Sequence, residues 1–123
     1  MELDITIKRG DTYEHTFLWV DPDTGERLPL TGWTARLQGR KKLTSSDTIF
    51  DFSSAADIEL IVDEQLNEIR FKLEHETTKA YALLEDGLFD LEVTEIASGY
   101  VETIIGGALI IEGDITRGYD DNP

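Results

Sequence analysis

The stretch that decides the fold is Thr77–Arg117, which reads TTKAYALLEDGLFDLEVTEIASGYVETIIGGALIIEGDITR. Within it, Phe89, Leu91 and Val93 fall on one side of an extended chain, and the polar residues that alternate with them fall on the other. A period of two with apolar residues on one face is typical of a β-strand that is covered on one side. The stretch therefore predicts a sheet with a buried face and a solvent face.

The same stretch predicts a short helix followed by a hairpin. Residues Gly87–Ile96 and Tyr100–Ile115 form two long strands, joined by a turn at Ser98-Gly99. Thr77 is the expected cap of the helix. The residues expected to face the sheet are Ala80, Leu83 and Leu84, with Gly87 beyond the helix end. The mid-strand pair Gly106-Gly107 predicts a bulge or a crossing between sheets, because glycine weakens a strand.

Further strands are expected on both sides of this stretch. Their ranges are Leu3–Lys8, Tyr13–Val20, Trp33–Lys41, Ile58–Val62 and Ile69–Leu73, with polar turns between them. The turn Asp21–Glu26 predicts a hairpin. Residues 42–56 are irregular and indicate a mobile contact loop or a short edge strand around Phe50. Short alternating strands at this spacing predict an all-β sandwich of about seven to nine antiparallel strands with one short helix.

Length and composition fit one soluble domain. The 123 residues, 40% hydrophobic and 30% charged, are enough for one core, predicted over residues 1–117 with a flexible tail at 118–123. No apolar run reaches the roughly 18–20 residues of a membrane helix, and the N-terminus lacks the apolar segment of a secretory signal. We expect synthesis in a cytoplasm and no membrane association. The absence of cysteine excludes disulfides and thiolate metal sites.

Charge is distributed unevenly along the chain. The net charge is −15, and acidic residues greatly outnumber basic ones after position 42. The exception is a basic group formed by Arg36, Arg40, Lys41 and Lys42. An acidic surface repels phosphate, so we expect no nucleic-acid partner. The basic group is interpreted as a solvated, self-repelling strand end that stays monomeric until a partner arrives.

Some short motifs have a structural and a functional interpretation. Asp21, Asp23 and Glu26 resemble the start of a calcium loop, but the glutamate at its twelfth position and the flanking helices are missing, which favours a simple turn. The tripeptide Arg9-Gly10-Asp11 spells an integrin-binding signal, yet a glycine between two strands already explains a turn. His15 is expected to be a packing or edge residue and not a metal ligand, because the only other histidine, His75, lies in a separate segment. We therefore expect no bound metal and no cofactor.

Nothing in the sequence predicts catalysis. No phosphate-binding loop, nucleophile elbow or zinc-protease motif is present, and the acidic residues fall on the wet faces of strands. Trp33 shares a parity with Ala35 and Leu37 and is expected to anchor the core. An alternative function is a carbohydrate- or host-surface-binding module, in which Trp19, Trp33 or Tyr100 would stack on sugars. That function requires at least one of these aromatic rings to be exposed.

Several segments together resemble a family of small proteins from tailed bacteriophages. They are ITIKRGDTY, DPDTGE with LPLTGWTARL, TTKAYALLEDGLFDLEV and IEGDITR, which cover most of the chain from Asp4 to Arg117. The family comprises virion proteins and the N-terminal domain of baseplate upper proteins. The resemblance implies an Ig-like antiparallel β-sandwich that serves a structural role in the particle. Baseplate upper proteins are longer and hold receptor-binding proteins, so the resemblance favours an adaptor of the tail, baseplate or capsid for this chain.

The resemblance also implies partners and a location. The partners would be other virion proteins and further copies of the same chain in a symmetric oligomer. The protein would reside in the virion after assembly in the host cytoplasm. The residues expected to contact partners are Arg36, Arg40, Lys41, Lys42, Phe50 and Tyr119.

Overall fold

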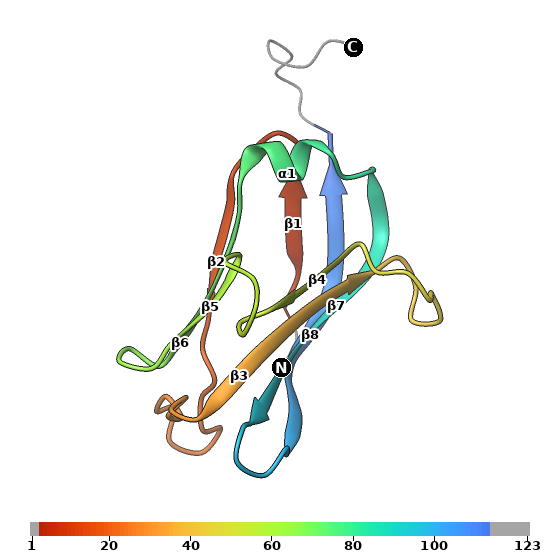
Figure 1. The fold of residues 1–123 in the computed structure, drawn as a ribbon. Helices are drawn as coiled ribbons and strands as arrows, with labels where there is room; N and C mark the ends of the chain where they lie inside the picture. The colour runs from red at the N-terminus through yellow and green to blue at the C-terminus, as the bar shows by residue number, and fades with distance from the viewer. Residues whose placement is uncertain (1–2, 114–123) are drawn as a thin grey trace.

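Two β-sheets pack face to face in the computed structural model, which describes residues 3–113 (Figure 1). The larger sheet has the order β1-β8-β7-β3-β4, with β1 at Ile5–Lys8, β8 at Val101–Glu112, β7 at Leu84–Glu95, β3 at Trp33–Arg40 and β4 at Phe50–Ser53. The smaller sheet has the order β2-β6-β5, with β2 at Tyr13–Phe17, β6 at Glu68–Leu73 and β5 at Leu60–Asp63. One short helix, α1, spans His75–Lys79. The predicted all-β sandwich is confirmed.

The core lies between the two sheets and is filled by alternate residues of the strands. In β1, for example, Ile5 and Ile7 are buried while Thr6 and Lys8 are exposed. The fully buried large side chains are Phe17, Phe71, Ile5, Ile7, Leu30, Leu37, Leu60, Ile69, Leu73, Leu91, Leu109 and Val93. Burial of apolar surface is the main stabilising contribution to such a fold, and the alternation in sequence anticipated most of these positions.

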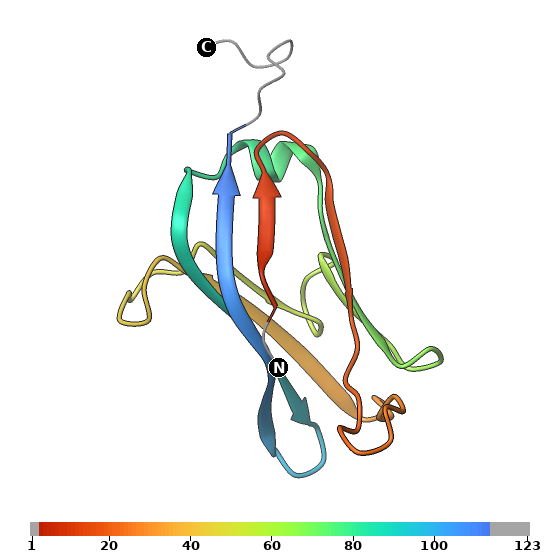
Figure 2. The ribbon, with the colours of Figure 1, turned by 180° about the vertical axis from the view of Figure 1, so that it is seen from behind.

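The pairing of β1 differs from the prediction of a purely antiparallel sandwich. β1 runs parallel to β8, with Ile5 opposite Leu109 and Ile7 opposite Ile111. Figure 2 shows β1 and β8 side by side with their arrows pointing the same way. The pairing is parallel because β1 enters the sheet from the end at which β8 begins. Period-two alternation reports which face is buried and carries no information about strand direction.

The hairpin of β7 and β8 contains two register shifts, between Leu84 and Gly87 and between Leu91 and Glu92, and neither lies at the predicted glycines. Leu91 pairs with Ile105 and Glu92 pairs with Thr103, so Ile104 is an extra residue in β8. Both Ile104 and Ile105 are buried, which an ideal alternation does not allow. Gly106-Gly107 instead makes room for the segment before β1. A Cβ on Gly107 would overlap the Leu3 carbonyl, and the Leu3 amide donates to the Gly106 carbonyl at 3.0 Å.

The turn at residues 21–26 joins strands of different sheets, so the predicted hairpin is only local. Val20 and Arg27 form an isolated bridge, whereas β2 pairs with β6, and β3 pairs with β4 and β7. The connection inserts Leu30, which is fully buried, into the core. The Leu30 amide donates to Asn67 Oδ1 at 3.0 Å, and Asn67 has the left-handed φ of 53°. The crossing segment is therefore fixed to the turn between β5 and β6.

The helix lies across one end of the sandwich, as expected, but its limits differ from the prediction (Figure 1). It begins at His75 with Glu74 as N-cap, and no side chain caps it, so Thr77 is not the cap. Leu84 and Gly87 belong to β7, and Leu83 is exposed. Thr78 is fully buried instead: its hydroxyl accepts from the Gly10 amide at 3.0 Å and donates to the Asp11 carbonyl at 2.8 Å. It ties α1 to the turn between β1 and β2.

Replacing Thr78 with valine is expected to lower the free energy of unfolding by about 1–2 kcal/mol, because two backbone groups lose a partner in a partly buried site. Thr77→Val is the matched control, since no hydrogen bond of the Thr77 side chain occurs in the described structure. Urea denaturation of both variants measures the difference. Equal stabilities would contradict the role assigned to the Thr78 hydroxyl.

Candidate interaction surfaces

The basic group does not act as one charged patch. The guanidinium of Arg36 makes a bidentate pair with Asp51, with Nε to Oδ1 at 2.9 Å and Nη2 to Oδ2 at 2.7 Å. Arg40 donates to the Ser45 carbonyl and is half-buried. Lys41 and Lys42 are exposed and form no ion pair within the described residues. Two of the four predicted contact residues are thus engaged within the chain, and two are available to a partner.

The ion pair between Arg36 and Asp51 lowers the pKa of the Asp51 carboxyl below its ordinary value of 3.8, chiefly through the hydrogen bonds from Arg36. A depressed pKa in the folded protein stabilises it above the ordinary value, and this contribution is lost as the pH falls below 3.8 through the folded pKa. Since both side chains are partly exposed, the pair contributes about 0.2–1 kcal/mol. Asp51→Asn is expected to lower stability at pH 7 by that amount and to reduce the loss below pH 4.

Thermal melts of wild type and Asp51→Asn between pH 7 and pH 3 check this expectation. Asp47→Asn, in the exposed loop before β4, is a control that changes the same charge without breaking an ion pair. A melting difference between wild type and Asp51→Asn that stays constant down to pH 3 would contradict it.

The prediction that Phe50 contacts a partner is wrong, because Phe50 is buried. The other predicted contact residue of this kind, Tyr119, lies outside the described residues. Phe50 begins β4, is buried in the core, and its ring centroid lies 5.6 Å from that of Phe71 in the opposite sheet. Of the two interpretations of this region, a mobile contact loop and a short edge strand, the edge strand is confirmed for residues 50–53. β4 pairs with β3 and lies at the edge of the larger sheet. The predicted tail 118–123 and the domain limit at residue 117 also lie outside the described part.

In the turn at residues 21–26, the carboxylate of Asp21 accepts hydrogen bonds from backbone amides of the same turn. Asp21 Oδ1 accepts from the Asp23 amide at 2.8 Å and from the Thr24 amide at 3.4 Å. This arrangement is an Asx-turn, so one oxygen of the Asp21 carboxylate stabilises the turn itself. Within residues 3–113, no group of three or more His, Asp or Glu side chains is placed to hold a metal. The calcium interpretation of Asp21, Asp23 and Glu26 has no support in this geometry.

The Arg9-Gly10-Asp11 turn packs against the helix, and the two histidines lie in different parts of the fold. Arg9 Nη2 donates to the Lys79 carbonyl at 3.0 Å, so the guanidinium is held against α1. His15 lies on β2, an edge strand, with its ring centroid 4.7 Å from that of Phe17. Partial burial lowers the pKa of His15. His75 is exposed at the start of α1.

The three aromatic residues of the glycan hypothesis lie together. Trp33 packs edge-on against Trp19, with centroids 4.9 Å apart, and against Tyr100, with centroids 6.3 Å apart. Both tryptophans are partly buried against the core. Tyr100 is 56% exposed, and its hydroxyl donates to Glu102 at 3.1 Å, a hydrogen bond that raises the pKa of Tyr100. Of the three residues, Tyr100 is exposed and the two tryptophans are half-buried.

A groove that the sequence did not predict lies beside this cluster, between the start of β3 and the edge strand β5. Its volume is about 490 Å³. Its walls are formed by Trp33, Thr34, Ser54, Ala55, Ala56, Asp57, Ile58, Leu60, Ile61, Val62, Glu64 and Ile96. Three of these are exposed apolar side chains: Ile58 at 87%, Ile96 at 66% and Ile61 at 44%. We call this feature the isoleucine groove.

One sequence signal could have revealed the groove. Leu60-Ile61-Val62 is an unbroken apolar run, so one of the three must face outward, and Ile61 does. Ile58 was expected to face inward by its parity with Leu60. It lies outside β5, however, in the turn that crosses from the larger sheet to the smaller one. Alternation stops being informative where the strand ends.

Comparisons with known proteins identify the fold alone. No protein-family model matches the sequence, and no curated protein matches it. Among solved structures, the chain resembles the NK cell receptor Nkp44, described as a triggering partner in natural cytotoxicity, with a TM-score of 0.53 and 7% sequence identity. The match covers 90% of this chain and 96% of the receptor chain. This similarity supports an Ig-like fold. No described helix is long and apolar enough to cross a membrane.

Proposed function

We propose that this protein is a structural component of a tailed-bacteriophage virion and acts through protein–protein contacts, as an adaptor of the tail, baseplate or capsid. The resemblance of the segments between Asp4 and Arg117 to phage virion proteins supplies the biological setting. The Ig-like sandwich supplies a rigid scaffold on which contact surfaces can be placed.

The observation that carries the proposal is the isoleucine groove. Exposed apolar side chains scattered singly are normal on a protein surface, but Ile58, Ile61 and Ile96 line one groove together with Trp33. Contiguous exposed apolar surface with a polar rim is typical of protein contact sites. Asp57 and Glu64 provide that rim. The net charge of −15 disfavours nucleic acid as the partner, because phosphate binding needs a basic surface.

The proposal is tested on particles. Tailed particles are purified by density gradient from a lysate of cells that carry this gene, and their proteins are quantified by mass spectrometry against the major capsid protein. We expect a fixed copy number per particle that survives high-salt washing, and antibody labelling at one location. Absence of the protein from intact, infectious particles would overturn a structural role in the virion.

The second candidate is a carbohydrate- or host-surface-binding module, and the exposure of Tyr100 is the observation that favours it. Trp33 packs edge-on against Tyr100, and the Tyr100 hydroxyl donates a hydrogen bond to Glu102. A sugar would stack on the Tyr100 ring and hydrogen-bond to the polar groups beside it. A glycan array distinguishes the two functions. Binding that is lost in Tyr100→Ala would favour this candidate, and no binding to any glycan would remove it.

A further inference from the structure

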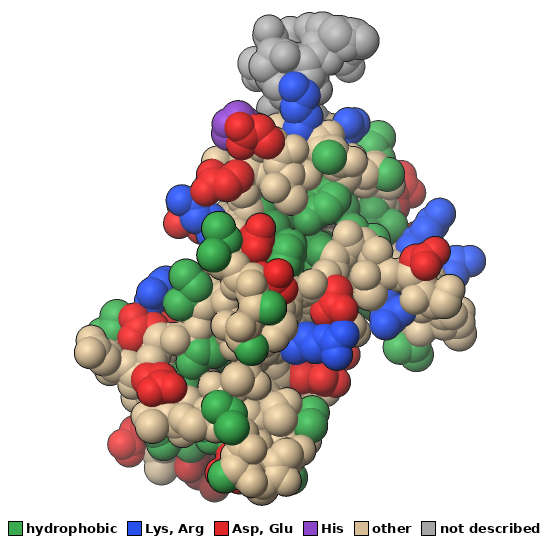
Figure 3. Space-filling view, viewed as in Figure 1, with side chains coloured by type: hydrophobic (Ala, Val, Ile, Leu, Met, Phe, Trp, Pro, Cys, Tyr) green, Lys and Arg blue, Asp and Glu red, His purple; other side chains and the backbone are tan. Residues whose placement is uncertain are grey.

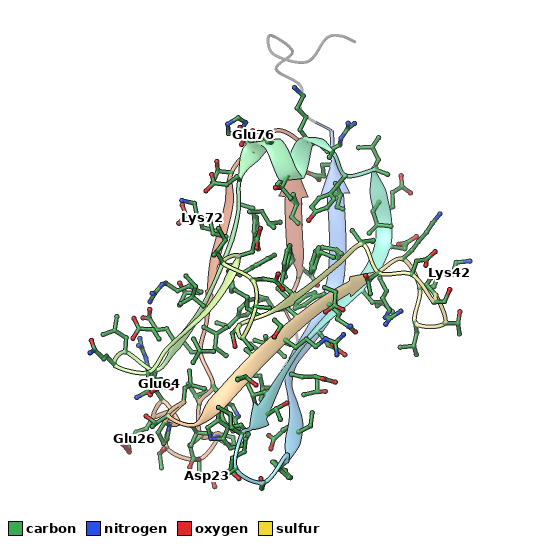
Figure 4. All side chains as sticks on the ribbon, in the orientation of Figure 1. Asp23, Glu26, Lys42, Glu64, Lys72 and Glu76 are labelled. Carbon is green, nitrogen blue, oxygen red and sulfur yellow. The ribbon has the colours of Figure 1, made fainter. Side chains whose placement is uncertain are left out.

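The loop between β3 and β4 carries a basic and apolar tip. Lys41 and Lys42 are exposed, and the adjacent Leu43 is 83% exposed, which leaves a large apolar side chain in solvent. Glu85 and Asp86 line a shallow pocket beside the two lysines, but no ion pair joins them to either lysine. In Figure 3 this side of the molecule projects on the right, where blue side chains surround a red one, and Figure 4 labels Lys42 there.

The isoleucine groove has the opposite character. Its apolar walls are rimmed by the carboxylates of Asp57 and Glu64. Asp57 Oδ2 accepts from the Ser53 amide at 2.8 Å, and Asp57 forms no ion pair among the described residues. Glu64 is exposed in the turn between β5 and β6 and forms no ion pair in the described part of the chain. A segment that combines lysines with an exposed leucine matches this groove in charge and in hydrophobicity.

The two surfaces cannot meet within one molecule. Figure 4 labels Lys42 on one side of the sandwich and Glu64 on the opposite side, and the two ribbon views agree on this separation. A contact between them therefore requires two copies. Because each copy would use a different surface toward each neighbour, the contact is head-to-tail, and such contacts close into rings when the rotation per subunit permits.

We propose that the tip Lys41-Lys42-Leu43 of one copy docks into the isoleucine groove of the next copy. Leu43 would contact Ile58 and Ile61, while the lysines would pair with Asp57 and Glu64. The partner in the groove is a second copy of this chain, because the tip that matches the groove in charge and hydrophobicity lies on the opposite side of the same protein. This assembly mode deepens the proposed function, on which it rests, and gives it a way to build a symmetric part of a particle.

The overall charge of −15 opposes association between copies at long range, so the lysines are the groups that make a local contact favourable. At about 0.15 M salt the screening length is about 8 Å, which weakens the general repulsion and preserves charge pairs in contact. The association should therefore be measured at physiological salt or above, across a range of protein concentrations.

The test is a charge-swap experiment followed by light scattering on the purified protein. The tip variant is Lys41→Glu/Lys42→Glu, and the groove variant is Ala56→Lys/Glu64→Lys; all four side chains are exposed, so the fold is retained. We expect wild type to assemble and each variant alone to associate at least about tenfold more weakly. An equal mixture of the two variants should regain assembly, because each now carries the charge complement of the other.

The net-charge control for the tip variant is Lys8→Glu/Lys72→Glu, which changes the total charge by the same amount as the tip variant but on β1 and β6. It should assemble like wild type. A wild type that stays monomeric at every concentration would overturn the proposal, and so would a tip variant that assembles normally or a control that fails equally. Such a failure would leave the virion role standing, because that role is measured on particles.

Discussion

Phe71→Ala is expected to lower the free energy of unfolding by about 3–5 kcal/mol, the cost of a large aromatic cavity in a packed core. Phe71 on β6 is buried and contacts rings from both sheets. Its centroid lies 5.6 Å from that of Phe50 and 5.9 Å from that of Phe52, both on β4, and 5.8 Å from that of Tyr13 on β2. This side chain connects the smaller sheet to the edge strand of the larger one, so its loss also removes packing contacts of β4.

Urea denaturation measures the effect, with two comparisons. Phe71→Leu keeps most of the volume and should recover a large part of the lost stability. Leu66→Ala, in the exposed turn of the same hairpin, should change stability by no more than about 0.5 kcal/mol. A Phe71→Ala protein as stable as the Leu66→Ala protein would show that the aromatic cluster is not a core contact.

Gly107→Ala is expected to destabilise the protein by about 2–3 kcal/mol, although alanine is normally tolerated better than glycine in a strand. The new Cβ would overlap the backbone carbonyl of Leu3, and a backbone atom cannot rotate away as a side chain can. The segment before β1 must then leave β8, with loss of the hydrogen bond from Leu3 to Gly106.

The neighbouring glycine provides a matched control. A Cβ on Gly106 would lie 3.5 Å from the Phe89 carbonyl, which is an ordinary contact, so Gly106→Ala should be nearly neutral. Thermal unfolding of the two variants compares the same chemical change one residue apart. Hydrogen exchange should show faster exchange in β1 for Gly107→Ala alone. Equal melting temperatures would contradict the close approach of Leu3.

The sequence was informative wherever one face of a strand is buried. The alternations of Phe89, Leu91 and Val93, and of Ile69, Phe71 and Leu73, predicted strands and core positions that the structure contains. They did so because burial alternates with the pleat. Alternation along one strand does not show which other strand pairs with it. The parallel pairing of β1 with β8 and the separation of β2 from β3 depend on contacts between residues far apart in sequence.

The candidate surfaces were only partly predictable for the same reason. Lys41 and Lys42 stay predicted contact residues, and that prediction rests on a basic run that stands out in an acidic chain. Phe50 was misassigned, since an aromatic residue in an irregular segment gives no indication of which ring will meet it from the other sheet. The isoleucine groove joins residues from 33 to 96, and a groove of this kind exists only after the two sheets have packed.

The parallel arrangement of β1 and β8 has a mechanical consequence. The chain enters β1 from Leu3 and leaves β8 at Glu112, and because the strands are parallel these points lie toward opposite ends of the paired segment. Tension applied between residues 3 and 113 therefore acts along both strands, and loads the hydrogen bonds of their four paired positions together instead of opening them one after another. The sandwich is thus arranged to resist a pull through its two ends by shear.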